Sequence, residues 1–414
     1  MARPSVAVTA LIAALLLPQA GRCEDVDRPA QKDGGPVGFM DRTGKVVIKP
    51  QFDDARPFTE GLAAVKKEGK WGYIDHSGGF AIPPRFIEAK PFRDGLAAVA
   101  VVGKGNRKRW GFVDRTGALA IEPRFTFASS FQEGLAYIGW AEPGTDEDRP
   151  EPGQSGRRSG YVNIDGTVVI TLPRQHAGGS FSEGRAPFVI RFEEGGSRYQ
   201  AGFIDCSGRI VVPATYQSVS AYSEGLAAVE NDENLYGFIN PAGNLVIPHR
   251  YSFTRCFSNG LASVLLEGRW TYIDSQGGVA FAAKEKRDRE GSEFQEGVAL
   301  AHMDGRDVLI DVRAVPVTRF DPRCDVWPPL QFLDWDENPR RIAAAIFSEG
   351  LIRFEDRTAK ANGRTRMGFV DRNGAVVIDA MYPEVGEFSE GLAPFSIKAG
   401  VFPTIPEPAG VRGE

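Results

Sequence analysis

The chain has 414 residues, 42% of them apolar, and a formal net charge of −5 at pH 7. This acidic balance argues against nucleic-acid binding, because that affinity depends on neutralising phosphates with lysine and arginine. The apolar content suffices for a large buried core. The four cysteines include no Cys-x-x-Cys pair, which argues against a zinc ribbon or a thioredoxin-type redox site.

The N-terminus has the pattern of a secretory signal. Arg3 precedes an apolar run over residues 6–17, and Pro18 and small residues follow it. The run is too short for a membrane-spanning helix, and no other segment is apolar enough to span a bilayer. We therefore predict a signal peptide over residues 1–23 and export to the periplasm or the cell exterior.

The residues around the expected cleavage point allow a competing interpretation. Cys23 stands where a lipid-modified cysteine would stand in a lipoprotein, but Arg22 directly before it fits that signal poorly. Residues 24–36 are polar and rich in glycine and proline, and we predict a flexible spacer there. Loss of Cys23 would leave three cysteines, Cys206, Cys256 and Cys324. Because this number is odd, the sequence leaves open which of them, if any, form a disulfide.

One short motif returns nine times along the remaining chain. It consists of an aromatic residue, a variable residue, usually an acid, and a glycine, and a short apolar run follows it. The nine copies begin at Phe58, Phe92, Phe131, Phe181, Tyr222, Phe257, Phe294, Phe347 and Phe388. Intervals of 34 to 53 residues are typical of repeat proteins, whose units bury their apolar faces against their neighbours.

The unit between Gly61 and Phe92 is predicted to contain three clear strands and a short fourth. Residues 62–65 and 71–75 form a hairpin, and an Asp-x-x-Gly turn leads from residue 75 to the third strand. The short fourth strand precedes the next aromatic residue. We expect a proline to end most of the third strands: Pro50, Pro84, Pro123, Pro173, Pro213 and Pro248. No window has a sustained 3.6-residue apolar period, so the chain is predicted to be all-β.

These residues resemble the WG-repeat family of bacterial proteins, also called the KWG repeat. The similarity rests on the sequence GKWGYID at 69–75, on RWGFVD at 109–114 and on the recurring Phe-Ser-Glu-Gly-Leu-Ala. It covers residues 37 to 400, although several copies lack the tryptophan and Thr271 replaces one of the glycines. The resemblance implies a repeat-built β protein of largely unassigned biochemistry, and it supplies no catalytic residues.

The predicted fold is a tandem array of nine three-to-four-stranded β-meander repeats over residues 37–400, with a C-terminal tail at 401–414. The array begins on a second strand at 38–41 and ends on a first strand at 392–396. Pairing of these two strands would close the array as in a β-propeller, whereas an open β-solenoid needs no such pairing. Nine units exceed the four to eight blades typical of propellers, so the solenoid remains the alternative.

Two insertions break the period, at 141–159 and at 312–341. The second contains two tryptophans and a cluster of acids, and loops carried on a rigid scaffold often bind partners. The candidate binding residues are Trp327, Trp335, Asp334 and Asp336. The alternative is that the segment covers the degenerate eighth unit. A basic cluster at 104–109 is interpreted as a solvated hairpin tip.

The repeated acid of the motif invites a catalytic or calcium-binding interpretation. Glutamate fills the position in seven copies, and Asp94 and Asn259 replace it in two. A catalytic acid is needed once or twice, so the repetition favours a structural carboxylate that accepts hydrogen bonds from nearby amides. The four histidines stand in separate repeats, and no Gly-x-Ser-x-Gly elbow, P-loop or dinucleotide fingerprint occurs. We therefore expect a protein that is not an enzyme and that has no catalytic residues, metal or cofactor.

The expected function is that of an exported, non-catalytic repeat scaffold that binds a protein or a cell-envelope component. One alternative is a protein that binds carbohydrate or peptidoglycan through exposed aromatic rings, and another is a hydrolase with its site in the 312–341 insertion. Exposure of Trp327, Trp335 and the tryptophans before the repeat glycines separates the first two interpretations, because surface rings beside a groove favour sugar and buried rings favour a scaffold. The candidate stacking rings elsewhere in the chain are Trp71, Trp110, Trp140 and Trp270, three of which occupy the same repeat position.

Overall fold

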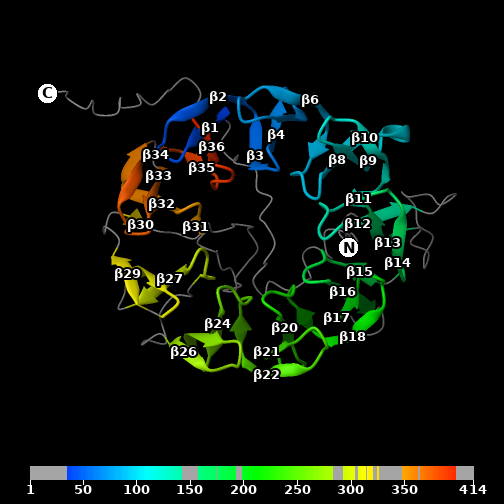
Figure 1. Ribbon diagram of the computed structural model, residues 1–414, viewed down its shortest axis with the longest axis vertical. Helices are drawn as coiled ribbons and strands as arrows, with labels where there is room; N and C mark the ends of the chain where they lie inside the picture. Colours follow the sequence, from blue (N-terminus) through cyan, green and yellow to red (C-terminus); the bar gives the residue numbers. More distant parts are fainter. Residues whose placement is uncertain are drawn as a thin grey trace, which may run out of the picture. The chain divides into compact units, whose positions relative to one another are not determined.

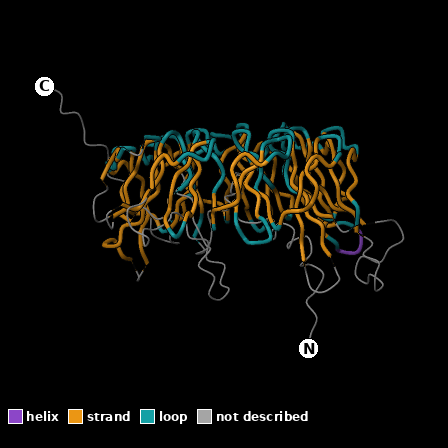
Figure 2. Tube along the Cα trace, turned by 90° about the horizontal axis from the view of Figure 1, so that it is seen from below, coloured by secondary structure: helices purple, strands orange, loops and turns teal. Residues whose placement is uncertain are grey.

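The computed structural model describes residues 35–141, 157–174, 176–192, 198–282, 292–303, 306–313, 315–319, 324–325, 347–361 and 364–397. Over these ranges the regular structure is β-strand, apart from one 3-10 turn, η1 (Lys104–Asn106). Figure 2 shows this turn in purple beside the orange strands. The all-β prediction is confirmed. The signal peptide, the tail at 401–414 and most of both insertions lie outside the described residues.

The described strands form nine antiparallel sheets, of which seven have four strands, one has three and one has five. The described residues divide into two compact units, one within 86–316 and the other within 27–85 and 317–414. The seven four-stranded sheets follow the predicted meander, and the short strand of each carries the repeated aromatic motif or lies shortly before it. Four-stranded antiparallel meanders are the blades of β-propellers.

The unit at 86–316 contains six consecutive sheets (Figure 1). The first three are built from β7 (Glu88–Ala89), β8 (Leu96–Val102), β9 (Lys108–Asp114), β10 (Leu119–Phe125); β11 (Phe127–Ala128), β12 (Leu135–Ala141), β13 (Arg157–Asn163), β14 (Val168–Leu172); and β15 (His176–Gly178), β16 (Arg185–Phe192), β17 (Arg198–Asp205), β18 (Ile210–Tyr216). The next three are built from β19 (Ser218–Val219), β20 (Ala227–Glu230), β21 (Tyr236–Ile239), β22 (Leu245–Tyr251); β23 (Phe253–Thr254), β24 (Leu261–Leu266), β25 (Arg269–Asp274), β26 (Val279–Ala282); and β27 (Val298–Met303), β28 (Arg306–Asp311), β29 (Pro316–Arg319).

The other unit contains three sheets. They are built from β3 (Asp54–Thr59), β4 (Leu62–Lys67), β5 (Lys70–Ile74), β6 (Phe80–Phe86); β30 (Cys324–Asp325), β31 (Phe347–Ser348), β32 (Leu351–Ala361), β33 (Arg364–Asp371), β34 (Val376–Tyr382); and β35 (Glu384–Val385), β36 (Leu392–Ser396), β1 (Val37–Asp41), β2 (Val46–Phe52). The second of these has five strands because β30 and β31 both pair with β32.

The last of these sheets is composed from both ends of the described chain. Strand β36 pairs antiparallel with β1 from Val37↔Ser396 to Asp41↔Leu392, and Figure 1 draws the two strands side by side. The pairing that we expected of a propeller-like array is therefore present.

The core lies between successive sheets. Phe39 of β1 and Phe58, at the end of β3, are fully buried and meet with ring centroids 5.0 Å apart. The same pairing recurs between Phe112 of β9 and Phe131 of the following sheet, at 4.7 Å. The aromatic residue of each of these motifs thus packs against the preceding sheet, which explains why a single repeat cannot bury its own apolar face.

The prediction that proline ends the outer strand is wrong for five of the six prolines. Strand β6 runs through Pro84 to Phe86, and the other outer strands likewise continue past their prolines. The proline lies where the outer strand arches over a glycine of the neighbouring strand. A Cβ on Gly72 would lie 2.5 Å from the Ile82 carbonyl oxygen and 2.7 Å from the Pro84 nitrogen. Because that nitrogen faces the glycine, the arch needs no amide donor there.

Candidate functional site

The repeated aromatic-x-acid-Gly motif is a two-residue hairpin turn. In the fifth copy Glu224 has φ +53° and Gly225 has φ +78°, and Ser223 and Leu226 exchange both backbone hydrogen bonds at 2.9 and 3.1 Å. Positive φ at both central residues is the type I′ turn that joins twisted strands. Glycine tolerates this conformation, whereas the glutamate before it is strained.

The carboxylate of the strained residue binds the next repeat. Glu224 accepts hydrogen bonds from the amides of Asn259 and Gly260 at 2.7 and 2.8 Å. Glu133 binds Glu183 and Gly184 in the same way, at 2.6 and 2.9 Å. We call this contact the inter-repeat clamp. It confirms that the repeated carboxylate is structural.

The clamp persists where glutamate is replaced. Asp94 accepts from the Gly134 amide at 2.7 Å, and the Asn259 side-chain oxygen accepts from the Gly297 amide at 2.7 Å. The serine of the motif adds a second link, because its hydroxyl donates to the carbonyl of the next aromatic residue: Ser182 to Tyr222, Ser223 to Phe257 and Ser389 to Phe58, at 2.6 to 2.8 Å. Sequence reasoning missed these partners, although the recurrence of serine before the acid signalled them.

Glu224→Ala is expected to lower the free energy of unfolding by about 1–2 kcal/mol, because it removes two charge-assisted hydrogen bonds and leaves two amides to water. Glu224→Asn should lose less, since asparagine tolerates a positive φ and Asn259 already serves as a clamp in this chain. Urea denaturation of the three proteins measures the difference. Equal stability of Glu224→Ala and the parent would show that the hydrogen bonds of the Glu224 carboxylate do not stabilise the fold.

The repeat tryptophans are packing residues wherever they are buried. Trp71 and Trp110 are 6% and 5% exposed. The Arg56 guanidinium lies 5.3 Å from the Trp71 ring centre, and Lys108 lies 5.5 Å from that of Trp110, distances at which cations are attracted to aromatic faces. Trp140 and Trp270 are partly buried. These rings favour the scaffold reading over a sugar platform.

The candidate binding residues of the second insertion lie outside the described residues: Trp327, Asp334, Trp335 and Asp336. The structure does place both ends of the segment. Asp325 of β30 pairs with Glu355, and Phe347 of β31 pairs with Ile352. Residues 326–346 therefore connect two strands, β30 and β31, that both pair with the same edge of β32. In the four-stranded sheets this edge is occupied by the one short strand of the repeat.

Titratable groups in the described ranges are dispersed. No three histidine, cysteine, aspartate or glutamate side chains there are placed to hold a metal ion. Burial lowers the pKa of His176 and of His249 and raises the pKa of Glu293. Cys206 is exposed and Cys256 is buried. Within the basic cluster, Lys108 pairs with Glu88 at 2.7 Å, so at least this cation has a local partner.

A model of the WG containing repeat matches the chain six times, at residues 38–71, 71–104, 110–138, 202–234, 236–270 and 367–398. The chain is a WG-repeat protein. A search of curated proteins found no match. In the part of the WG-repeat chain that the structure describes, no helix has the length and apolar character needed to cross a membrane.

Several solved structures align with the WG-repeat chain at low sequence identity. A eukaryotic initiation factor aligns with a TM-score of 0.51 at 9% identity, over 88% of this chain and 98% of that one. BamB from Moraxella catarrhalis aligns with a TM-score of 0.35 at 12% identity, over 71% and 93%. The WD40 β-propeller domain of Doa1 aligns with a TM-score of 0.27 at 11% identity, over 67% and 94%. At such identities the likeness concerns the fold alone.

Proposed function

We propose that this WG-repeat protein is an exported, non-catalytic scaffold that binds a protein or cell-envelope partner through the segment at 326–346. The observation that carries the proposal is the inter-repeat clamp. The repeated acids, which are the residues best suited to general acid–base chemistry, are already engaged with backbone amides of the next repeat. The most regular polar groups of the chain thus serve assembly.

Export is supported by the signal pattern of residues 1–23, which has no counterpart in the repeats. The segment at 326–346 is favoured as the binding element because it obeys no repeat pattern and both its ends are fixed on β32. A rigid sheet that presents a variable segment is the usual way in which scaffolds combine stability with recognition. The mature protein would thus present this segment on a scaffold of repeats.

The double variant Trp327→Ala/Trp335→Ala is expected to lose partner capture while its melting temperature moves by only a few degrees, because side chains that serve binding contribute little to folding. Immobilised chain 24–414 and the variant are compared for retention of proteins from an envelope extract. The matched control is Leu119→Ala/Val169→Ala, which removes two side chains that are 43% and 47% exposed on other sheets.

Two outcomes would contradict the proposal. If the tryptophan variant unfolds, the segment is a cover for the eighth unit. If it keeps its fold and every partner, binding lies elsewhere. Retention of purified peptidoglycan in place of protein would support the carbohydrate-binding alternative, and its loss in the tryptophan variant would still place the site at 326–346.

A further inference from the structure

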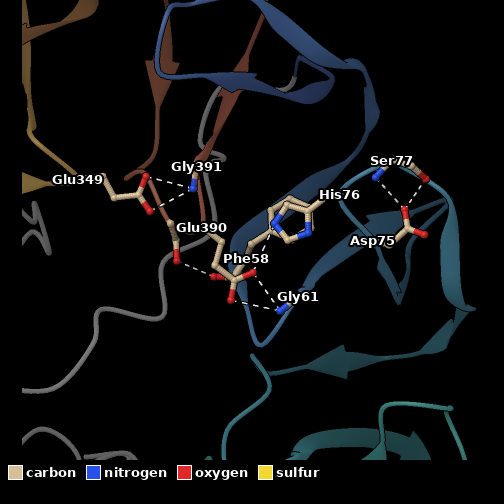
Figure 3. A network of polar contacts seen from close by, with 9 residues as sticks. Phe58, Gly61, Asp75, His76, Ser77, Glu349, Glu390 and Gly391 are labelled. Carbon is tan, nitrogen blue, oxygen red and sulfur yellow. Dashed lines mark hydrogen bonds and ion pairs between the residues drawn. The ribbon is translucent and has the colours of Figure 1, made fainter.

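The junction between the ninth and the first copy of the motif contains a histidine that contacts both. His76 lies in the turn after β5, and its ring stacks on Phe58 with centroids 4.3 Å apart and planes 20° apart. Its Nε2 lies 3.4 Å from Oε2 of Glu390. Figure 3 shows the imidazole over the phenyl ring with the carboxylate at its edge. The stacking fixes the ring where its charge acts on Glu390.

Glu390 is the carboxylate that fastens the end of the described chain to its beginning. It accepts from the Gly61 amide with both oxygens, at 2.9 and 3.1 Å, and the preceding Ser389 donates to the Phe58 carbonyl at 2.6 Å. Strand β36 follows directly and pairs with β1. The histidine therefore acts on the clamp that secures the composite sheet to the sheet of β3–β6.

Corresponding turn positions in two other junctions carry residues that do not titrate near neutrality. Pro241 occupies the position at the junction of Glu183 with Gly225, where the clamp is 2.9 Å long. Arg42 occupies it at the junction of Glu349 with Gly391, and its Nη2 lies 3.1 Å from where a Cβ of Gly350 would stand. Arginine stays charged at all physiological pH values. The junction with Pro241 therefore has an uncharged residue at this position, and the junction with Arg42 has a permanently charged one.

We propose that His76 and Glu390 form a pH-sensitive latch that tightens the closing junction in acid and loosens it in base. Histidine is the side chain that ordinarily changes charge between about pH 5 and 8. The imidazolium attracts the carboxylate, and the neutral ring does not.

Asp75 and Asp54 belong to the same sheet as His76, and the pKa of each departs from its ordinary value. Asp75 directly precedes the histidine, and hydrogen bonds from Ser77 hold the pKa of this carboxyl below its ordinary value. It therefore stays ionised and favours the imidazolium. On β3 of the same sheet, burial raises the pKa of Asp54 to about 6, against the opposing effect of Arg56 and Lys66. A raised folded-state pKa means that stability falls as the pH rises through about 6.

Amide hydrogen exchange at Gly61 tests the latch, with Gly225 as the control amide. In the full chain at about pH 5.5 and about pH 8, corrected for intrinsic exchange, protection of Gly61 should fall about two- to five-fold at the higher pH, the range expected of an exposed ion pair. Protection of Gly225 should change less. His76→Arg should keep the Gly61 amide protected at both pH values, and His76→Gln should leave it weakly protected at both.

Two results would overturn the proposal. Equal pH responses of Gly61 and Gly225 would mean that the junction carries no special titration. A pH response that survives in both His76→Gln and His76→Arg would assign it to another group, and its disappearance in Asp54→Asn would identify that group as Asp54. Melting temperatures at each pH verify that every variant is folded.

Discussion

Gly72→Ala is expected to lower the free energy of unfolding by about 3 kcal/mol, the upper part of the range for overpacking a well-packed site. The added methyl group would lie 2.5 Å from the Ile82 carbonyl oxygen, and 2.7 Å from the Pro84 nitrogen. Both contacts are with backbone, so no side-chain rotation relieves them and β6 must move away from β5.

Gly69→Ala is the matched control, in the hairpin turn of the same sheet. A Cβ there would meet nothing within 4 Å, but φ is +75°. The expected loss of stability is therefore only the cost of placing alanine in the left-handed conformation, about 1 kcal/mol. Urea denaturation of the two variants separates crowding from backbone strain. If both lose the same stability, the arch of the outer strand over the glycine does not explain the Trp-Gly signature.

One repeat already carries the substitution naturally. Thr271 of β25 stands where Gly72 stands in β5, and it pairs with Ala282 of β26. That outer strand, Val279–Ala282, contains no proline. A side chain at the glycine position thus occurs with an outer strand of different sequence, as the crowding argument requires.

A chain that ends at Gly391 is expected to lose the fold of the unit at 27–85 and 317–414, or to melt more than about 10 °C lower. It lacks β36, whose Leu392, Phe395 and the adjacent Ile397 are 6%, 1% and 4% exposed. Three such side chains contribute about 5–9 kcal/mol by burial, which is comparable to the whole stability of an ordinary domain.

The matched control is a chain that ends at Ile397 and retains β36. Thermal melting followed by circular dichroism, with limited proteolysis at 25 °C, compares the two truncations with the full chain. The control should melt within a few degrees of the parent. Identical melting of both truncations would show that the β1–β36 pairing does not hold the unit together.

The turns were predictable because their energetics are local. In the turn that begins at Asp75, this residue accepts from the amides of Ser77 and Gly79, and Gly78 has φ +83°. Four or five consecutive residues decide such a conformation. The prolines were misread for the opposite reason. Their tolerance inside β6 depends on a glycine in another strand, and propensity alone does not report that pairing.

The candidate site was likewise predictable in part. That the repeated acid is structural followed from its repetition, whereas its partner amide did not, because Glu224 and Gly260 are 36 positions apart and Glu390 and Gly61 are 329 apart. Nothing in the motif identifies His76 as a partner of Glu390. The contact exists only because β36 returns to pair with β1.

By itself the sequence determined that this chain is a nine-fold array of β-meanders, because strand alternation, turn glycines and the apolar period are properties of short segments. The tertiary structure alone decided how neighbouring repeats are fastened. A carboxylate in a left-handed turn becomes a clamp only when the next sheet presents its amides within hydrogen-bonding distance. That distance depends on the buried aromatic contacts between sheets, such as Phe39 with Phe58, and these form only when distant parts of the chain pack together.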